Sequence, residues 1–227
     1  MIFDTISDRV QGYMLKKASN QLHIPHMNIW LDIEVISVNG RILKKVHQRA
    51  KSWNRNAYNI IFSVLSGISL RDATFGAGLL SVKEIGGNID NNQLCYPATS
   101  AYIAAGSDNT VGIVVGTGVG TESFDGFTLG TPIAPGNATG QLYTLPSESN
   151  SRSYGALTMT NTLIRYFNNN SGSIITVGEV GLIAQSIDDS GVRAHFMTCR
   201  DKLTPTISVP DTAQLKATYT INLVYPS

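Results

Sequence analysis

The stretch that most plainly decides the fold is Leu215-Lys216-Ala217-Thr218-Tyr219-Thr220-Ile221-Asn222-Leu223-Val224. Its odd-numbered side chains are apolar, and the even-numbered ones are polar as far as Asn222. Since successive side chains of a strand point to opposite faces, this period of two predicts a half-buried strand. Apolar runs bounded by Gly, Asn, Asp or Pro precede it at 157–167, 174–184, 194–198 and 206–209. Strands spaced in this way favour an antiparallel sandwich or barrel.

Composition agrees with a mainly β chain. The 227 residues are 42% hydrophobic and only 15% charged, with 21 glycines. The formal net charge of +1 provides no overall field to steer nucleic acid. We expect an antiparallel, jelly-roll-like β-sandwich with long glycine-rich loops over residues 68–227. Residues 1–67 are expected to form a separate docking segment made of a helix, a hairpin and a second helix.

Three local patterns support that docking segment. In the first 27 residues, Val10, Tyr13 and Met14 fall near one face of an amphipathic helix. Asn39-Gly40, between two alternating apolar arms, predicts a hairpin with a type I′ turn. Apolar residues three and four apart predict a helix over 46–65, with Gly67 as its C-cap.

Patterns that carry chemistry are incomplete. The glycines of Gly112–Gly120 are not followed by a helix, and the Gly-Lys-Ser/Thr of a P-loop is absent. His23 and His26 flank a proline without further zinc ligands nearby, and Glu122 with Asp125 offers too few oxygens for Ca²⁺. We therefore predict no catalytic residue, no metal site and no cofactor.

Cellular context is indicated by what the sequence lacks. The N-terminus does not show the basic-then-apolar layout of a secretory signal, and 60–70, the longest apolar-leaning run, is shorter than a membrane span. We expect no membrane association. Cys95 and Cys199 are expected to be buried thiols in a reducing cytoplasm, although a bridge between them stays open.

The strongest charge feature is basic. Residues 41–55 contain no acid, and residues 1–55 carry nine basic and four acidic side chains. Such a segment is either a solvated or protein-facing surface, a subunit contact against an acidic neighbour, or a nucleic-acid contact. Interleaved aromatics for base stacking are nearly absent, which argues against nucleic acid. The candidate partner-contact residues are Arg41, Lys44, Lys45, Arg49, Lys51 and Arg55.

Four ordered stretches resemble motifs of a family of tailed-bacteriophage virion structural proteins. These are Lys51-Ser52-Trp53-Asn54-Arg55-Asn56-Ala57-Tyr58-Asn59, the Ile-Val-Val-Gly-Thr-Gly run within 112–120, the Asn-x-Ser-Gly-x-x-Ile-Thr-Val-x-Glu-Val-Gly-Leu signature within 168–182, and Met-x-x-Arg-Asp-x-Leu at 197–203. The resemblance implies a virion component, made in the host cytoplasm, that associates with its own copies and docks onto other virion proteins. A place in the tail, the tail tip or the neck is favoured over capsid decoration.

The same motifs predict one internal contact and leave two other functions open. Glu179, within an apolar strand, needs a partner if buried, and Arg200 and Arg165 are the candidates. A saccharide-binding adhesin would use exposed aromatics, for which the candidates are Trp30, Tyr143 and Tyr154. A cell-wall hydrolase, the least favoured function, would depend on Glu122, Asp125 or His195.

Overall fold

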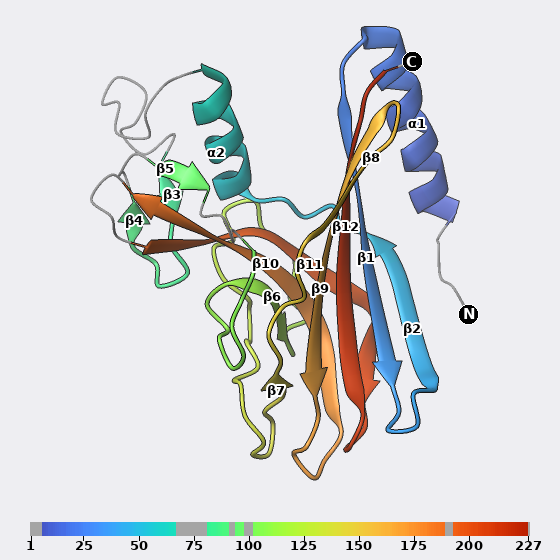
Figure 1. The fold of residues 1–227 in the computed structure, drawn as a ribbon, viewed down its shortest axis with the longest axis vertical. Helices are drawn as coiled ribbons and strands as arrows, with labels where there is room; N and C mark the ends of the chain where they lie inside the picture. Colours follow the sequence, from blue (N-terminus) through green and yellow to red (C-terminus); the bar gives the residue numbers. More distant parts are fainter. Residues whose placement is uncertain (1–5, 67–80, 91–93, 98–101, 189–192, 227) are drawn as a thin grey trace.

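The computed structural model describes residues 6–66, 81–90, 94–97, 102–188 and 193–226 (Figure 1). Strands dominate this part of the chain. The two helices are α1 (Ile6–Leu22) and α2 (Arg55–Ser66). The strands are β1 (His26–Ile36), β2 (Ile42–Arg49), β3 (Val82–Lys83), β4 (Ile89–Asp90), β5 (Leu94–Pro97), β6 (Gly112–Gly116), β7 (Tyr143–Thr144), β8 (Ser151–Tyr154), β9 (Thr158–Asn168), β10 (Ile175–Asp188), β11 (Arg193–Val209) and β12 (Gln214–Val224).

Two antiparallel sheets form the body of the molecule. The larger has the order β2-β1-β12-β9-β7, and β8 also pairs with β9. In the smaller sheet β10 pairs with β11 along one edge, and with β6 and β5 along the other. A separate short ladder joins β3 to β4. This arrangement confirms the predicted mainly β fold with antiparallel, sandwich-like sheets.

The hydrophobic core lies between the two sheets. From the larger sheet, Leu215, Ala217 and Tyr219 are fully buried, as the period of two predicts. From the smaller sheet, Val177, Val180 and other β10 and β11 side chains complete the same cluster. Burying such side chains contributes roughly 1.5–3 kcal/mol each, which makes this cluster the main source of stability.

The predicted hairpin is present, but its turn differs from the predicted type. β1 and β2 pair from Trp30↔Arg49 to Ile36↔Ile42, and the loop is closed by a hydrogen bond from the Ser37 N–H to the Arg41 carbonyl. Gly40 has a φ of 78°, whereas Asn39 does not lie in that region. A type I′ turn needs positive φ at both central residues, so this longer loop with one left-handed glycine replaces it.

The helix predicted over 46–65 is wrong in its first half. Residues up to Arg49 belong to β2, and α2 begins only at Arg55, after Asn54, whose Oδ1 accepts the Ala57 N–H at 3.4 Å. The spacing of Val46 with later apolar residues is typical of a helix. Pairing with β1 nevertheless makes the residues up to Arg49 a strand. Gly67 lies outside the described residues.

The predicted boundary at residue 67 does not separate a docking segment from the sandwich. β1 lies between β2 and β12, and its Leu31, Ile33 and Val35 are fully buried in the core. Among the helices and strands of residues 6–66, the two helices lie outside the sheets, with α1 beside β1 and α2 near β11 and β3 (Figure 1). Neither is long and apolar enough to cross a membrane.

Candidate interaction surfaces

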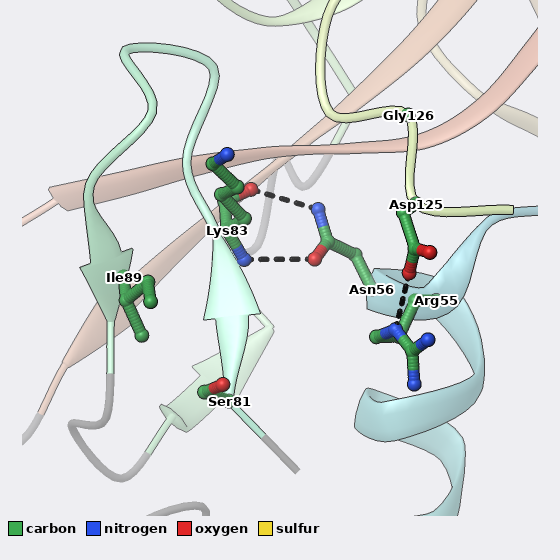
Figure 2. Close-up of a pocket in the computed structure, with 7 residues that line it drawn as sticks. All are labelled: Arg55, Asn56, Ser81, Lys83, Ile89, Asp125 and Gly126. Carbon is green, nitrogen blue, oxygen red and sulfur yellow. Dashed lines mark hydrogen bonds and ion pairs between the residues drawn. The ribbon is translucent and has the colours of Figure 1, made fainter. Parts of the chain in front are cut away.

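Two of the six candidate basic residues are neutralised by acids of this chain. Lys45 Nζ lies 3.0 Å from Glu34 and 3.3 Å from Asp32 on the neighbouring strand. Arg55 Nε lies 2.5 Å from Asp125, whose loop passes the start of α2 (Figure 2). Because these contacts are exposed to solvent, water screens them and they contribute little to stability. They nevertheless reduce the charge available to an acidic neighbour.

The other four basic residues are dispersed. Lys44 Nζ donates to the Thr206 carbonyl at 3.0 Å, and Arg49 is buried with its guanidinium 5.7 Å from the centre of the Trp30 ring. Arg41 and Lys51 are exposed, at the hairpin turn and after β2 respectively. The basic run in the sequence therefore does not become one continuous basic patch, and its role as a partner contact stays a prediction.

A small hollow of about 200 Å³ lies between α2 and the β3–β4 ladder (Figure 2). Asn56 in α2 bonds both backbone groups of Lys83: its Nδ2 donates to the carbonyl, and its Oδ1 accepts the N–H, each at 2.8 Å. These bonds fasten the ladder to the helix. The polar residues of this hollow are thus already used in holding two elements together.

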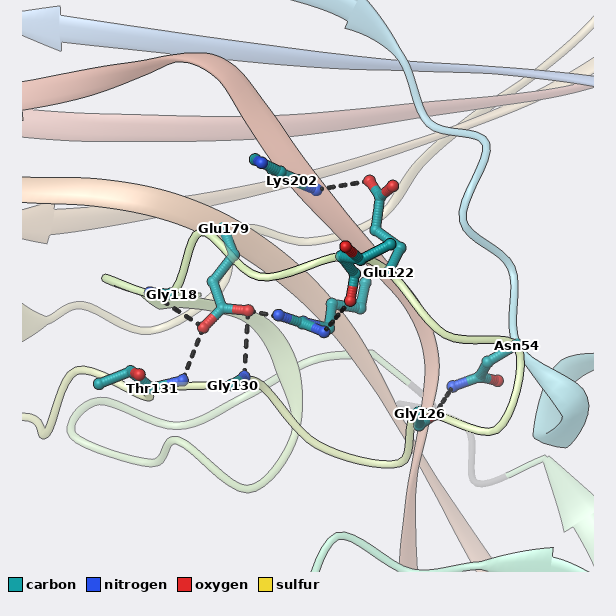
Figure 3. Close-up of polar contacts among 10 residues, drawn as sticks. Asn54, Gly118, Glu122, Gly126, Gly130, Thr131, Glu179 and Lys202 are labelled. Carbon is teal, nitrogen blue, oxygen red and sulfur yellow. Dashed lines mark hydrogen bonds and ion pairs between the residues drawn. The ribbon is translucent and has the colours of Figure 1, made fainter.

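Glu179 in β10 is the centre of a buried polar cluster (Figure 3). Its carboxylate accepts Arg200 Nε at 2.6 Å and the N–H groups of Thr131 at 2.8 Å, Gly130 at 3.1 Å and Gly118 at 3.2 Å. Burial alone would raise the pKa of Glu179, but these hydrogen bonds hold it below its ordinary value. The prediction of Arg200 as partner is confirmed, and the cluster anchors the glycine-rich loops to the sheet.

Arg165 is not the partner of Glu179. It is fully buried in β9, and among the described residues its guanidinium donates to five backbone carbonyls. Burial lowers its pKa to about 10, so it keeps its charge at neutral pH. Ala105, Asp108 and Val111 lie in the loop before β6, Ile113 lies in β6 itself, and Leu145 follows β7.

A third buried cluster surrounds Asp201. Its Oδ1 accepts the N–H groups of Lys51 and Ser52, and its Oδ2 accepts the Cys199 thiol and the Tyr219 hydroxyl, both at 3.0 Å. Cys199 is a free, buried thiol whose pKa burial raises well above the usual value, so it is a poor nucleophile at neutral pH. The side chain of Cys95 lies outside the described residues.

The remaining catalytic candidates are also occupied in structural contacts. Glu122 Oε1 accepts the Lys202 N–H at 2.9 Å, while Asp125 binds Arg55 (Figure 3 shows the first contact). His195 Nε2 lies 2.8 Å from the Gln185 amide. Within the described ranges, no three His, Cys, Asp or Glu side chains gather in a way that could hold a metal ion.

The three aromatic candidates for saccharide binding are far apart. Trp30 is stacked on His47, with ring centres 4.6 Å apart. Tyr154 pairs with Met159 at one end of β9, and Tyr143 pairs with Asn168 at the other. At about 3.3 Å per residue these two tyrosines are roughly 30 Å apart, so they do not form one sugar-binding platform.

The apolar face of α1 points away from the sheets. Val10, Tyr13 and Met14 are 46%, 69% and 63% exposed, whereas Asp8 and Ser19 on the other side of the helix are buried. A helix in a globular protein normally turns its apolar stripe toward the core. Here the order is reversed, which leaves three large apolar side chains in contact with solvent. The sequence contains this stripe, but only the structure shows its direction.

A second apolar surface lies where the larger sheet extends past the smaller one. The cross-strand row Met27–Leu223–Met159–Tyr154 continues the core-facing side of the sheet. Tyr154 is 77% exposed, and a groove of about 430 Å³ runs over β8, β9 and β12 at this place. Figure 1 shows these strands extending upward beyond β10 and β11. This sheet end and the outer face of α1 are the candidate interaction surfaces.

No protein-family model, curated protein or solved structure matches this chain.

Proposed function

We propose that this chain is a structural component of a tailed-bacteriophage virion. It assembles by associating with its own copies and by docking onto neighbouring virion proteins. The motifs at 51–59, 168–182 and 197–203 support the phage assignment by resemblance. Their residues form the start of α2, the β9–β10 connection with the first half of β10, and the middle of β11.

The observation that carries the proposal is the outward apolar face of α1. Exposed apolar surface of this kind marks sites of protein association. An interface that holds a subunit in a particle buries about 1,000 Å² or more in total. The α1 face and the uncovered sheet end, which contains Met159 and Tyr154, supply two separate apolar areas for such contacts. Two areas on one subunit are what a repeating assembly with two kinds of neighbour requires.

Self-association is tested by measuring the molecular mass of the purified chain against concentration, by light scattering after gel filtration. Tyr13→Ser combined with Met14→Ser removes the apolar area, and we expect the dissociation constant to rise at least about tenfold. Lys16→Ser with Lys17→Ser is the matched control, because both lysines are exposed on the same helix. A wild-type chain that stays monomeric at millimolar concentration would contradict the proposal.

The virion assignment is tested separately by locating the protein. Mass spectrometry of separated heads and tails, together with gold-labelled antibody on intact particles, should find it in the tail fraction. Its presence only in the cytosol of infected cells would refute a structural role in the virion.

A further inference from the structure

A hollow of about 320 Å³ lies beside α1, where β2 ends and the chain continues toward α2. Leu15 of α1 and Met27 and Ile29 of β1 provide its apolar walls. Arg49 lines it from the end of β2, and Lys51 and Trp53 line it from the segment that connects β2 to α2. Figure 1 shows this connection passing between the two helices. The volume is at the lower end of the range of small-ligand sites.

Arg49 is a buried cation that no described acid neutralises. It is 9% exposed, and no ion pair joins it to an acid among the residues that the structure describes. Its Nη1 is buried without a hydrogen-bond acceptor in that part of the chain. The helix approaches closely, since a Cβ on Gly12 would lie 3.0 Å from Nη1. An unpaired buried guanidinium is costly, so an acceptor at this position would be strongly favoured.

Trp53 also lines this hollow. Its Nε1 is also buried without a hydrogen-bond acceptor in the described structure. An indole N–H and a guanidinium can only donate hydrogen bonds. Both side chains therefore need a hydrogen-bond acceptor. Lys51 adds a positive charge at the edge, where it is exposed.

We propose that this hollow is a binding site for a carboxylate carried on a short aliphatic group. The carboxylate accepts from Arg49 and Trp53, and the aliphatic part contacts Leu15, Met27 and Ile29. Inorganic phosphate has no apolar part and fits these walls less well. The carboxylate belongs either to a free small acid or to the side chain of a peptide segment. This site is additional to the assembly function proposed above and does not depend on it.

The first test measures how tightly the wild-type full-length chain binds a charged probe, hexanoate, and a neutral probe, hexanamide. The dissociation constants are measured by isothermal titration calorimetry. We expect hexanoate to bind at least about tenfold more tightly than hexanamide, because a hydrogen-bonded charge pair contributes more than a neutral one. Inorganic phosphate is expected to bind at least about tenfold more weakly than hexanoate. Equal binding of hexanoate and hexanamide would show a merely apolar hollow and overturn the proposal.

Variants assign the contacts. Arg49→Met keeps the apolar stem and should weaken hexanoate binding at least about tenfold, while Trp53→Phe, which removes only one neutral donor, should weaken it about threefold. Arg41→Met is the matched control, since Arg41 is exposed at the hairpin turn. A folded Arg49→Met protein with wild-type affinity for hexanoate overturns the proposal. If that variant does not fold by circular dichroism, the wild-type comparison of hexanoate with hexanamide decides alone.

A second pair of probes distinguishes the sources of the carboxylate. The peptide acetyl-Leu-Glu-Leu-amide is compared with its Gln counterpart under the same conditions. A Glu peptide that binds more tightly than both its Gln counterpart and hexanoate identifies a neighbouring protein chain as the source. Hexanoate binding without discrimination between the peptides identifies a free small acid. Equal binding of hexanoate and hexanamide overturns the proposal whatever the peptides show.

Discussion

Two arginines of the larger sheet, Arg165 and Arg49, are both buried, yet their surroundings differ completely. Arg165 donates to five backbone carbonyls and so ties the loops around β6 to β9. Arg49, in β2 beneath α1, has the Trp30 ring as its neighbour and leaves a buried Nη1 unbonded in the described structure. Arginine therefore holds loops together through hydrogen bonds in one region, and leaves a buried donor without a described acceptor in the other.

The difference extends beyond these two side chains. Five buried side-chain polar atoms lack a hydrogen-bond partner in the part of the chain that the structure describes, and four of them lie between residues 26 and 53. Around Glu179 and Asp201, in contrast, the carboxylates accept three or more donors each. Buried polar groups are normally satisfied. The buried polar groups of the sandwich interior thus bond to one another, whereas those near α1 leave donors that another molecule can bind.

The largest effect should follow from Arg165→Met. The five carbonyls would lose their donor inside the protein, and we expect the free energy of unfolding to fall by about 3–5 kcal/mol. Urea denaturation followed by circular dichroism measures it. Arg152→Met, on the exposed strand β8, is the control and should change stability by less than about 0.5 kcal/mol. A loss below about 1 kcal/mol for Arg165→Met would remove the contrast with Arg49.

Glu179→Gln tests the buried polar cluster around Glu179. The substitution removes the charge that Arg200 faces and places an amide N–H₂ against backbone N–H groups, so a loss of about 2–4 kcal/mol is expected. The same denaturation experiment on Glu148→Gln, which alters an exposed carboxylate, serves as the comparison. Equal stability of the two variants would mean that the Glu179 cluster is not an anchor.

The pH dependence of stability should report the same cluster. Because the pKa of Glu179 is held below its ordinary value in the folded protein, its contribution is present above about pH 4.5 and is lost as pH falls through the folded pKa. The stability difference between wild type and Glu179→Gln should therefore shrink below about pH 4. Asp201, whose pKa burial raises, is common to both proteins and cancels in this difference. A difference that stays constant down to pH 2 would contradict the ion pair.

Gly40→Ala tests the hairpin that carries β2 to its place beside β1. The φ of 78° at Gly40 is a conformation that alanine adopts with strain, so a loss of about 1 kcal/mol is expected. Gly86→Ala is the matched control, because a Cβ there meets nothing within 4 Å and no positive φ is involved. Thermal melting of both variants measures the difference. Similar melting temperatures would show that the turn tolerates a Cβ.

Arg49→Met should have the smallest effect on stability. Removing an unpaired buried charge while keeping its apolar stem is expected to change the free energy of unfolding by less than about 1 kcal/mol, or to raise it. Urea denaturation measures this change. Arg165→Met is the matched comparison, because it makes the same substitution at an arginine that is fully hydrogen-bonded. If Arg49→Met lowered the free energy of unfolding as much as Arg165→Met, Arg49 would also be a structural hydrogen-bond donor.

Sequence reasoning predicted the features that depend on near neighbours. The alternation over 215–223 indicated β12, because the period of side-chain direction is a local property of an extended backbone. Gly40 indicated the hairpin, and the spacing of Val10, Tyr13 and Met14 indicated α1. The sandwich class followed from the succession of such strands. Whether the chain is a virion protein stays a prediction from resemblance.

Tertiary structure alone decided what depends on residues far apart in the chain. Val46 became part of a strand because β1 offers it a partner, and β1 joined the sandwich because β12, nearly two hundred residues later, pairs with it. The direction of the α1 stripe and the different surroundings of Arg165 and Arg49 have the same origin. The sequence by itself determined β12 and the position of the hairpin, since their signals lie within a few residues. Packing determined which side chains are buried, paired or left as open donors, because burial is a property of the assembled sheets.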